Sequence, residues 1–329
     1  MTLAVSPEVA GALADAAPVV ALESTIFSPF GLPAPANREA LDRCLAAVRA
    51  GGAVPAITAV LDGVARVGLA PGEHDRILDG GVKVAERDLP VAIGQDAPVG
   101  VTTVSASLAL AATAGVRVFA TGGVGGVHRG AEVTGDVSAD LGALAAHPVV
   151  TVSAGAKAFL DLARTLEQLE TLSVPVLGWR TDEFPMFWCH SSGLPVPHRV
   201  DDAATVARIM RAQRDLGAMR GVLLAVPIPD EAAIDRDVVE AAIDAAALEA
   251  GSGPGTTPKV LAAIADATGG RTVRANIVLA EHNASVAAAV AGELTQDDVL
   301  APRDARKEAL WCGVARWAVA DATDEEENG

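Results

Sequence analysis

Tyrosine is absent from this chain of 329 residues, and aromatic side chains make up only 3% of it. Cysteine is also scarce, because Cys44, Cys189 and Cys312 are the three in the sequence and lie far apart. Their spacing matches neither a zinc finger nor a framework of paired disulfides. A reducing cytoplasm is the simplest setting for such a chain.

Positive charge is in short supply. Lys and Arg number 25 against 42 Asp and Glu, which gives a formal net charge of −17. A nucleic-acid-binding surface needs clustered cations, so this composition excludes nucleic acid as the expected partner. It leaves room for a small phosphorylated ligand, because one lysine and a few backbone amides can hold a phosphate.

No segment has the character of a membrane span. The longest uncharged run, residues 97–116, carries Pro, Gly, Thr and Ser in its first half and predicts a strand followed by a buried helix. The N-terminal residues lack the basic start and long apolar segment of a signal peptide. We therefore expect a soluble protein without a membrane partner.

Short apolar runs alternate with longer Ala- and Leu-rich segments along the chain. Strands are predicted within residues 18–25, 53–63, 116–123, 147–155, 174–179 and 221–229. Helices are predicted over residues 38–52, from Ala156 or Lys157 to about Thr171, and over most of the chain after residue 230. This alternation is typical of an α/β layered fold with a substantially parallel sheet.

The composition shifts once, near residue 300. We expect residues 1–299 to form a single domain and residues 300–329 to form a C-terminal extension with one helix and a disordered acidic end. Within the domain, ligands of layered α/β folds collect where strands end and helices begin.

Glu23 is the only charged side chain between Asp15 and Arg38, and it lies inside an apolar strand pattern. Burial disfavours a charged carboxylate, so a desolvated Glu23 would suit the role of a general acid. The alternative is a carboxylate at the end of the strand that is paired or faces water. The sequence leaves both interpretations open.

Residues 121–130, TGGVGGVHRG, form a glycine-rich loop after a predicted strand. Glycines allow backbone amides to approach an anion, but the spacing matches neither the Walker pattern nor the dinucleotide fingerprint. A tight connection is therefore the simpler interpretation, with His128 and Arg129 favouring a binding role.

Asp136 and Asp140 are four residues apart, so they share one side of a helix or of a strand. Their oxygens suit a hard cation such as Mg²⁺ or Mn²⁺. The alternative is structural, with Asp136 as a helix N-cap and Asp140 as an acid in the first turn.

Lys157 is the only charged side chain between Asp140 and Asp161. We expect it at the start of a helix, where the partial positive charge of the terminus disfavours an ammonium. A neutral lysine is a nucleophile that can form a Schiff base with a sugar carbon. The alternative is a lysine whose head reaches water.

These residues belong to longer motifs: ALESTIFSPFGLPAPAN, KVAERDLP, GVTTVSASL, FATGGVGGVHRG, DVSADL, VVTVSAGAKAFLDLARTLEQLET, TDEFPMFW, PIPDEAAI and GTTPKVLAAIADATGGRTVRANIVLAEHNASVAAAVA. In order and spacing the motifs resemble the pseudouridine-5'-phosphate glycosidases, a group that includes the indigoidine synthase A-like proteins. The resemblance covers roughly residues 15–298.

The resemblance implies a Mn²⁺-dependent enzyme that reversibly cleaves the C–C glycosidic bond of pseudouridine 5'-phosphate, giving uracil and ribose 5-phosphate through a lysine Schiff base. It also implies a three-layer α/β/α fold with a large mixed, mostly parallel sheet, assembled as a homotrimer. No sugar-kinase domain is fused to the chain, so a separate pseudouridine kinase is the expected pathway partner.

The same resemblance assigns roles. Glu23 would be the acid, Lys157 the covalent nucleophile and Asp136 the metal ligand. The implied substrate-binding residues are Lys83, which would meet the phosphate, and Val104, His128, Ser138, Ala139, Asp140 and Asn276.

Several positions depart from the family pattern, in which Ser-Arg usually stands at Ala85–Glu86, Asn at Val226, Phe at Lys259 and Asn-Asn at His282–Asn283. They leave open a related C-glycosidase or lyase acting on another sugar phosphate or on a C-nucleoside of secondary metabolism. A non-catalytic sugar-phosphate sensor is a third possibility, but such a module needs no nucleophile.

Overall fold

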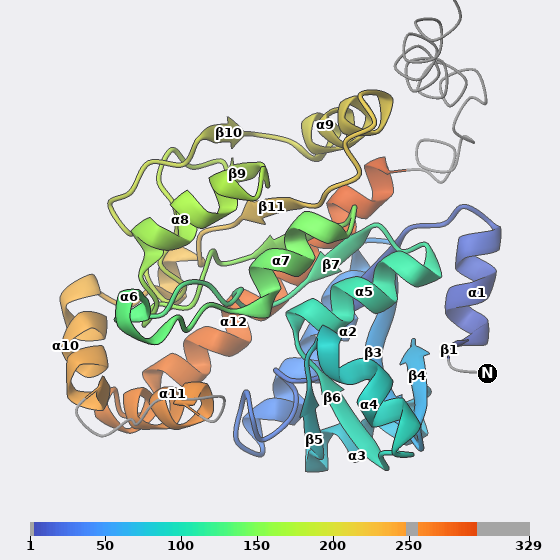
Figure 1. Ribbon diagram of the computed structural model, residues 1–329, viewed down its shortest axis with the longest axis horizontal. Coiled ribbons are helices and arrows are strands. Elements are labelled where there is room, and N and C mark those ends of the chain that lie inside the picture. The colour runs from blue at the N-terminus through green and yellow to red at the C-terminus, as the bar shows by residue number, and fades with distance from the viewer. Residues whose placement is uncertain (1–2, 248–255, 295–329) are drawn as a thin grey trace, which may run out of the picture.

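The computed structural model describes residues 3–247 and 256–294 (Figure 1). Its strands are β1 (Leu3–Val5), β2 (Val19–Leu22), β3 (Val54–Leu61), β4 (Val64–Val67), β5 (Val82–Val84), β6 (Val99–Thr102), β7 (Val118–Ala120), β8 (Val150–Ser153), β9 (Val176–Trp179), β10 (His198–Val200) and β11 (Val222–Ala225).

Its helices are α1 (Pro7–Ala14), α2 (Ala36–Ala50), α3 (His74–Asp79), α4 (Leu89–Gly94), α5 (Val104–Ala114), α6 (Ala131–Thr134), α7 (Ala139–Ala146), α8 (Leu162–Thr171), α9 (Ala203–Asp215), α10 (Arg236–Ala247), α11 (Thr256–Ala267) and α12 (Arg271–Glu293). Short 3₁₀ turns cover Pro71–Glu73, Glu86–Asp88 and Asp230–Ala232.

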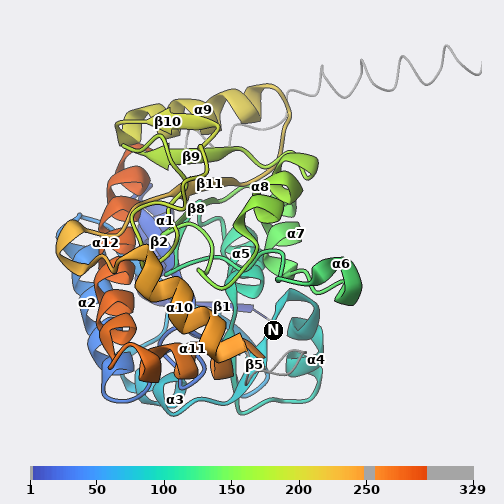
Figure 2. The same ribbon diagram turned by 90° about the vertical axis from the view of Figure 1, so that its left-hand side faces the viewer.

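The strands join in one mixed sheet of the order β1-β4-β3-β2-β7-β8-β11-β9-β10, while β6 pairs with β3 and β5 pairs with β6. Among the described strands, only the pairings of β3 with β4 and β6 are antiparallel. Helices α2 and α12 cover one face, and α5 and α7 cover the other (Figure 2). The expected α/β/α fold class is confirmed.

The central strands are buried on both faces. Every residue of β2, β7, β8, β9 and β11 is buried. Strands enclosed by two helical layers read as nearly continuous apolar runs, which is why the sequence pattern located them. All of the predicted strand segments contain strands of the sheet.

The expected start of the helix after β8 is wrong. Helix α8 begins at Leu162, with Asp161 as its N-cap accepting a hydrogen bond from Arg164 N at 3.0 Å. Lys157 therefore lies in a loop, four residues before that cap, and not at the start of a helix. The predicted end near Thr171 is confirmed.

Two of the cysteines, Cys44 and Cys189, are buried free thiols. Burial raises the pKa of Cys44 to about 12 and that of Cys189 to about 11, so neither is a reactive thiolate at neutral pH. Cys312 and the extension expected over residues 300–329 lie outside the described residues. Within those residues, no helix is long and apolar enough to cross a bilayer.

Candidate active site

The site lies where strands from two directions end. Glu23 directly follows β2, Thr121 follows β7, and Lys157 lies in the loop after β8, so these parallel strands bring the three residues to one edge. Strand β6 runs antiparallel to β3 and ends at the same place, where Thr25 N donates to Thr102 O at 3.1 Å.

Glu23 is buried, with 7% of its surface exposed, and accepts a hydrogen bond from the Thr121 hydroxyl through Oε1. Burial raises the pKa of Glu23 to about 7, against the opposing effects of Lys157, the Thr121 hydroxyl and Lys83. A carboxyl with this pKa is protonated in a large fraction of molecules at neutral pH, as a general acid requires. The interpretation of Glu23 as a water-facing carboxylate is therefore wrong.

Two lysines approach Glu23 without an ion-pair partner of their own. In the described part of the chain, no hydrogen bond or ion pair within 4.0 Å involves the ammonium of Lys157 or of Lys83. Burial lowers the pKa of Lys83 most, and repulsion from Lys157 lowers it further. Asp140 and Glu23 act in the opposite direction. Ammonium groups without a carboxylate partner suit an anionic sugar ligand.

The glycine-rich loop at residues 121–130 organises the site. Its Val124 carbonyl accepts from Lys157 N at 3.1 Å, and its Val127 carbonyl accepts from Asp161 N at 2.9 Å. On the other side, Gly126 O accepts from Ser138 N at 3.0 Å. The loop therefore joins the segment that carries Lys157 to the segment that carries Asp136 and Asp140.

Several amides of this loop are used within the protein. Those of Val124, Gly125, Val127 and His128 donate to protein acceptors at 2.9–3.1 Å. A Cβ on Gly125 would lie 2.2 Å from Ser138 Oγ, and one on Gly126 would lie 2.4 Å from Thr165 Oγ1. The glycines thus permit close packing, which favours the tight connection over a phosphate cradle.

Asp140 is an acid in the first turn of α7, as one interpretation expected, and 6% of its surface is exposed. Its Oδ1 accepts from Ser105 N at 3.0 Å and its Oδ2 from Gly125 N at 2.9 Å. Asp140 therefore holds the start of α5 against the glycine-rich loop. Both of its oxygens are already occupied by backbone donors.

Asp136 is not the N-cap of α7, because Ser138 takes that place. Its side chain is 43% exposed, with Oδ2 3.8 Å from His128 Nδ1. Burial lowers the pKa of His128, against the effect of Asp136, and Lys157 and Lys83 lower it further. The Asp136 carboxylate is the one of the pair that is open to a ligand.

A fully protein-bound metal does not fit these residues. Within residues 3–247 and 256–294, no group of three or more His, Cys, Asp and Glu side chains is placed to hold an ion. A hard cation can instead keep several waters and bind through one carboxylate. Asp136 fits that second arrangement.

The other predicted residues lie on the helices α5, α7 and α12 or cap them. Ser138 caps α7 and Ala139 is its first, exposed residue, while Val104 is the buried first residue of α5. Asn276 of α12 is 7% exposed, and its Oδ1 accepts from Trp188 Nε1 at 2.7 Å. Its amino group has no protein partner among the described residues.

Glu86, which stands where the family usually has arginine, pairs with a nearby histidine. Its Oε1 lies 2.9 Å from His147 Nε2, and its backbone N–H donates to Ser105 Oγ at 3.2 Å. The carboxylate therefore has a partner other than Lys83, three residues away.

Val226, which stands where the family usually has asparagine, is fully buried, and its N–H donates to Ser153 O at 2.8 Å.

Sequence reasoning missed residues that reach the site from far along the chain. Thr121 donates to Glu23 across 98 positions, and Asn283 donates to the Thr121 carbonyl across 162. Phe187 packs beside Gly123 with an unusual positive φ of 56°. Backbone strain of this kind often accompanies a functional site, but spacing alone cannot reveal it.

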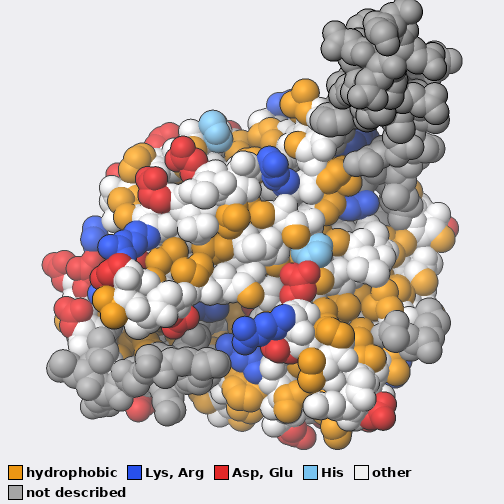
Figure 3. Space-filling model, in the orientation of Figure 1, with side chains coloured by type: hydrophobic (Ala, Val, Ile, Leu, Met, Phe, Trp, Pro, Cys, Tyr) orange, Lys and Arg blue, Asp and Glu red, His pale blue; other side chains and the backbone are white. Residues whose placement is uncertain are grey.

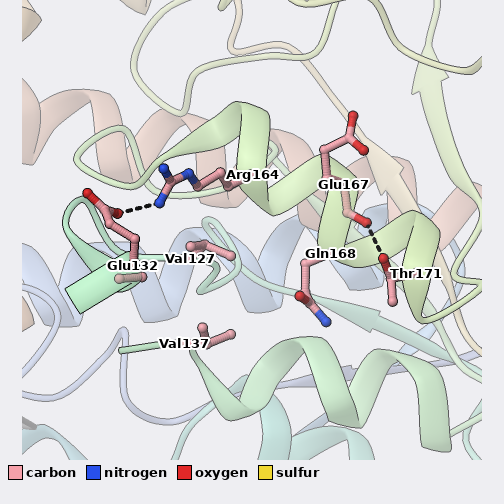
Figure 4. Close-up of a pocket in the computed structure, with 8 residues that line it drawn as sticks. Val127, Glu132, Val137, Arg164, Glu167, Gln168 and Thr171 are labelled. Atoms are coloured by element: carbon pink, nitrogen blue, oxygen red, sulfur yellow. Dashed lines mark hydrogen bonds and ion pairs between the residues drawn. The ribbon is translucent and has the colours of Figure 1, made fainter. Parts of the chain in front are cut away.

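A separate groove lies between α6 and α8 (Figure 4). It is lined by Val127, Ala131, Glu132, Val137, Arg164, Glu167, Gln168 and Thr171. Glu132 pairs with Arg164 at one end, and none of the lining residues was predicted to belong to the site. The molecular face in Figure 3 carries acidic and basic side chains in small groups rather than one broad basic patch.

Comparisons with known proteins identify relatives of nearly full length. A pseudouridine-5'-phosphate glycosidase from Caldanaerobacter subterraneus is 47% identical over 88% of this chain and 96% of its own length. One from Herpetosiphon aurantiacus is 49% identical over 89% and 98%, respectively. A prealnumycin C-glycosynthase, solved with ribulose 5-phosphate, superposes with a TM-score of 0.82 at 37% identity, over 89% of this chain and 97% of that one.

The family profile described as "Indigoidine synthase A like protein" matches residues 8–293, nearly the whole described chain. The motifs on which the resemblance rests fall within this span, as do all the strands of the sheet except β1. The chain belongs to the indigoidine synthase A-like protein family.

Proposed function

We propose that this protein is a glycosidase that cleaves the C–C bond between uracil and ribose in pseudouridine 5'-phosphate, in a reversible reaction. The observation that carries the proposal is the meeting of a buried Glu23, whose pKa is raised, with two lysines that lack ion-pair partners among the described residues. The relatives of nearly full coverage that are named for this activity support the choice of substrate.

The proposed reaction begins at the sugar ring. Glu23 donates its proton to the ring oxygen as the bond from that oxygen to C1' breaks, which leaves C1' electrophilic. The Glu23 carboxylate then takes a proton from the Lys157 ammonium, and the resulting amine bonds to C1'. A carbon leaving group cannot be protonated directly as the oxygen of an ordinary glycoside can, so this covalent route is needed.

The covalent adduct then releases both products. The C1'–C5 bond breaks, its electron pair passes to uracil C5, which takes up a proton, and an iminium remains between C1' and Lys157. Water adds to C1', the lysine departs, and ribose 5-phosphate is freed. Overall, one water is consumed for each uracil and ribose 5-phosphate formed.

Lys83 is the proposed phosphate contact, and the other expected substrate-binding residues keep their assigned roles as proposals. Mn²⁺ would be held by Asp136 through one carboxylate, with water completing its coordination. A bound divalent cation would supply positive charge beside the substrate anion. Assembly as a homotrimer, a cytoplasmic location and supply of substrate by a separate pseudouridine kinase are further parts of this proposal.

Uracil release tests the reaction. Pseudouridine 5'-phosphate is incubated with the protein, with and without Mn²⁺, and free uracil is measured by chromatography. We expect uracil from the natural protein and none above background from Lys157→Ala. Borohydride added during turnover should place a ribose 5-phosphate adduct on Lys157 by peptide mass spectrometry. An adduct on another residue would refute the assigned nucleophile.

A second candidate keeps the lysine chemistry with another C-nucleoside or sugar phosphate. The structural similarity to a C-glycosynthase solved with ribulose 5-phosphate favours it. Turnover of pseudouridine 5'-phosphate, pseudouridine and ribulose 5-phosphate would be compared at equal concentrations. Preference for the first supports the main proposal, and exclusive use of another compound supports the second candidate.

A further inference from the structure

The hydrogen bond between Thr121 and Glu23 distinguishes the two oxygens of the acid. The Thr121 hydroxyl donates to Oε1. An oxygen that accepts this bond is the poorer carrier of the acidic proton, because the donor favours its charged form. Oε2 is therefore left as the oxygen that bears and delivers the proton.

Thr121 is held in turn by Asn283 of α12. The Asn283 amino group donates to the Thr121 carbonyl at 2.8 Å and to the Gly122 carbonyl at 3.2 Å. Thr121 N donates to Val152 O at 3.0 Å, so the backbone of this residue is fixed on both sides. The fixed backbone keeps the Thr121 side chain within reach of Glu23, to which its hydroxyl donates.

Asn283 is a buried polar residue whose hydrogen-bonding capacity is only partly used. It is 1% exposed, and its Oδ1 is a buried acceptor without a hydrogen-bond partner in the described chain. A buried polar atom without a partner is costly, so a purely structural position would favour an apolar side chain. The two bonds made by the amino group give a reason for an amide at this position.

We propose that Asn283 is a positioning residue that acts through Thr121 to fix which oxygen of Glu23 delivers the proton. Asn283 does not touch Glu23, and its effect passes through the start of the glycine-rich loop. The inference rests on the proposed function, because it concerns the acid of that reaction. Through Asn283 and Thr121, helix α12 is connected by hydrogen bonds to Glu23.

The charged groups that face Glu23 are Lys157, Lys83 and Asp140. The lysines lower the pKa of Glu23 and Asp140 raises it, while burial has the largest effect. Thr121 is the uncharged contributor and also lowers the pKa. Removing its hydroxyl should therefore raise the pKa of Glu23 without changing the charge of the site.

The test follows the titration of Glu23 by difference infrared spectroscopy, with Glu23→Gln as the blank. In Thr121→Val the carboxyl band should titrate at higher pH by about one pH unit. Thr121→Ser should restore the natural value. Asn283→Ala should shift the titration in the same direction, and the double variant should shift it no further than Thr121→Val alone.

Thr165→Val is the matched control. Thr165 is a fully buried threonine that holds the same loop, accepting from Val127 N at 3.0 Å, and it makes no bond to Glu23. We expect it to lower stability without moving the Glu23 titration. Circular dichroism would establish that each variant is folded before it is titrated.

Additive shifts in the double variant, or no shift in folded Asn283→Ala, would overturn the inference. The infrared readout requires no substrate, so it remains decisive if the protein releases no uracil. If uracil is released, the alkaline limb of kcat/KM should move with the carboxyl titration in each variant. Failure of uracil release would instead count against the proposed function.

Discussion

At the scale of single residues, burial is what gives Glu23 its chemistry. The side chain leaves an apolar strand, and loss of water raises its pKa to about 7 from an ordinary value of 4.5. The folded state therefore binds this proton more tightly than the unfolded chain does. The stability that this proton contributes is fully present below pH 4.5 and is lost as the pH rises through about 7.

Glu23→Gln should consequently stabilise the protein in alkaline solution. The advantage over the natural protein should grow between pH 4.5 and 7 and reach at most about 3 kcal/mol above that range. Urea unfolding at pH 5 and at pH 8 measures the difference. An equal difference at both values would show that Glu23 does not titrate in this interval.

Local charge spacing showed Glu23 and Lys157 to be unusual, and family motifs supplied their roles. Thr121 and Asn283 gave no such signal, because their contacts span 98 and 162 positions. A threonine in a loop and an asparagine in a helix are ordinary residues until the fold brings them together. Burial and long-range pairing are properties that spacing does not record.

At the scale of elements, the strands were predictable and one helix start was not. Phe159 fits the helical spacing of Leu162, Leu166 and Leu169, but it is buried within a loop, with its ring 6.2 Å from that of His128. Tertiary packing therefore explains an apolar residue that periodicity assigned to the helix. Asp161, a favourable N-cap residue, was the local signal for the true start.

The glycine-rich loop should not tolerate side chains at its close contacts. Gly125→Ala places a Cβ 2.2 Å from Ser138 Oγ and 2.8 Å from Asp140 Oδ2. We expect a loss of about 1–3 kcal/mol in unfolding free energy and a large loss of activity. Gly142→Ala, on the exposed side of α7 with open space around it, is the matched control. It should stabilise by about 0.5–1 kcal/mol.

Substitution of Asp140 should lower stability, whereas substitution of Asp136 should affect ligand binding. Asp140→Asn weakens a group that accepts from two backbone amides, so we expect a loss of about 2–4 kcal/mol. Asp136→Asn should change stability by less than about 0.5 kcal/mol, because the side chain is 43% exposed. Thermal unfolding measures both, and Mn²⁺ titration of activity should distinguish Asp136→Asn. Equal destabilisation would contradict this division.

At the scale of the whole molecule, repulsion among negative charges should outweigh the exposed ion pairs. The net charge is −17, while pairs such as Arg199–Asp182 and Arg49–Glu8 lie at exposed side chains. Exposed pairs contribute little, whereas salt screens the repulsion of the whole surface. We expect Tm to rise as sodium chloride increases from low to moderate concentration. A falling Tm would show that the surface pairs dominate.

The meeting of β2 and β6 has a consequence for the size of the substrate. Glu23 follows the end of β2, whereas Lys83 lies on β5, which is aligned with β6 through the pairs Lys83–Val101 and Val84–Thr102. The separation between Glu23 and Lys83 is thus set by two strands that run toward each other. Sliding β5 by one residue would change that separation by about 3.3 Å. With Glu23 as the proposed acid and Lys83 as the proposed phosphate contact, the sheet fixes the distance between the bond to be broken and the phosphate.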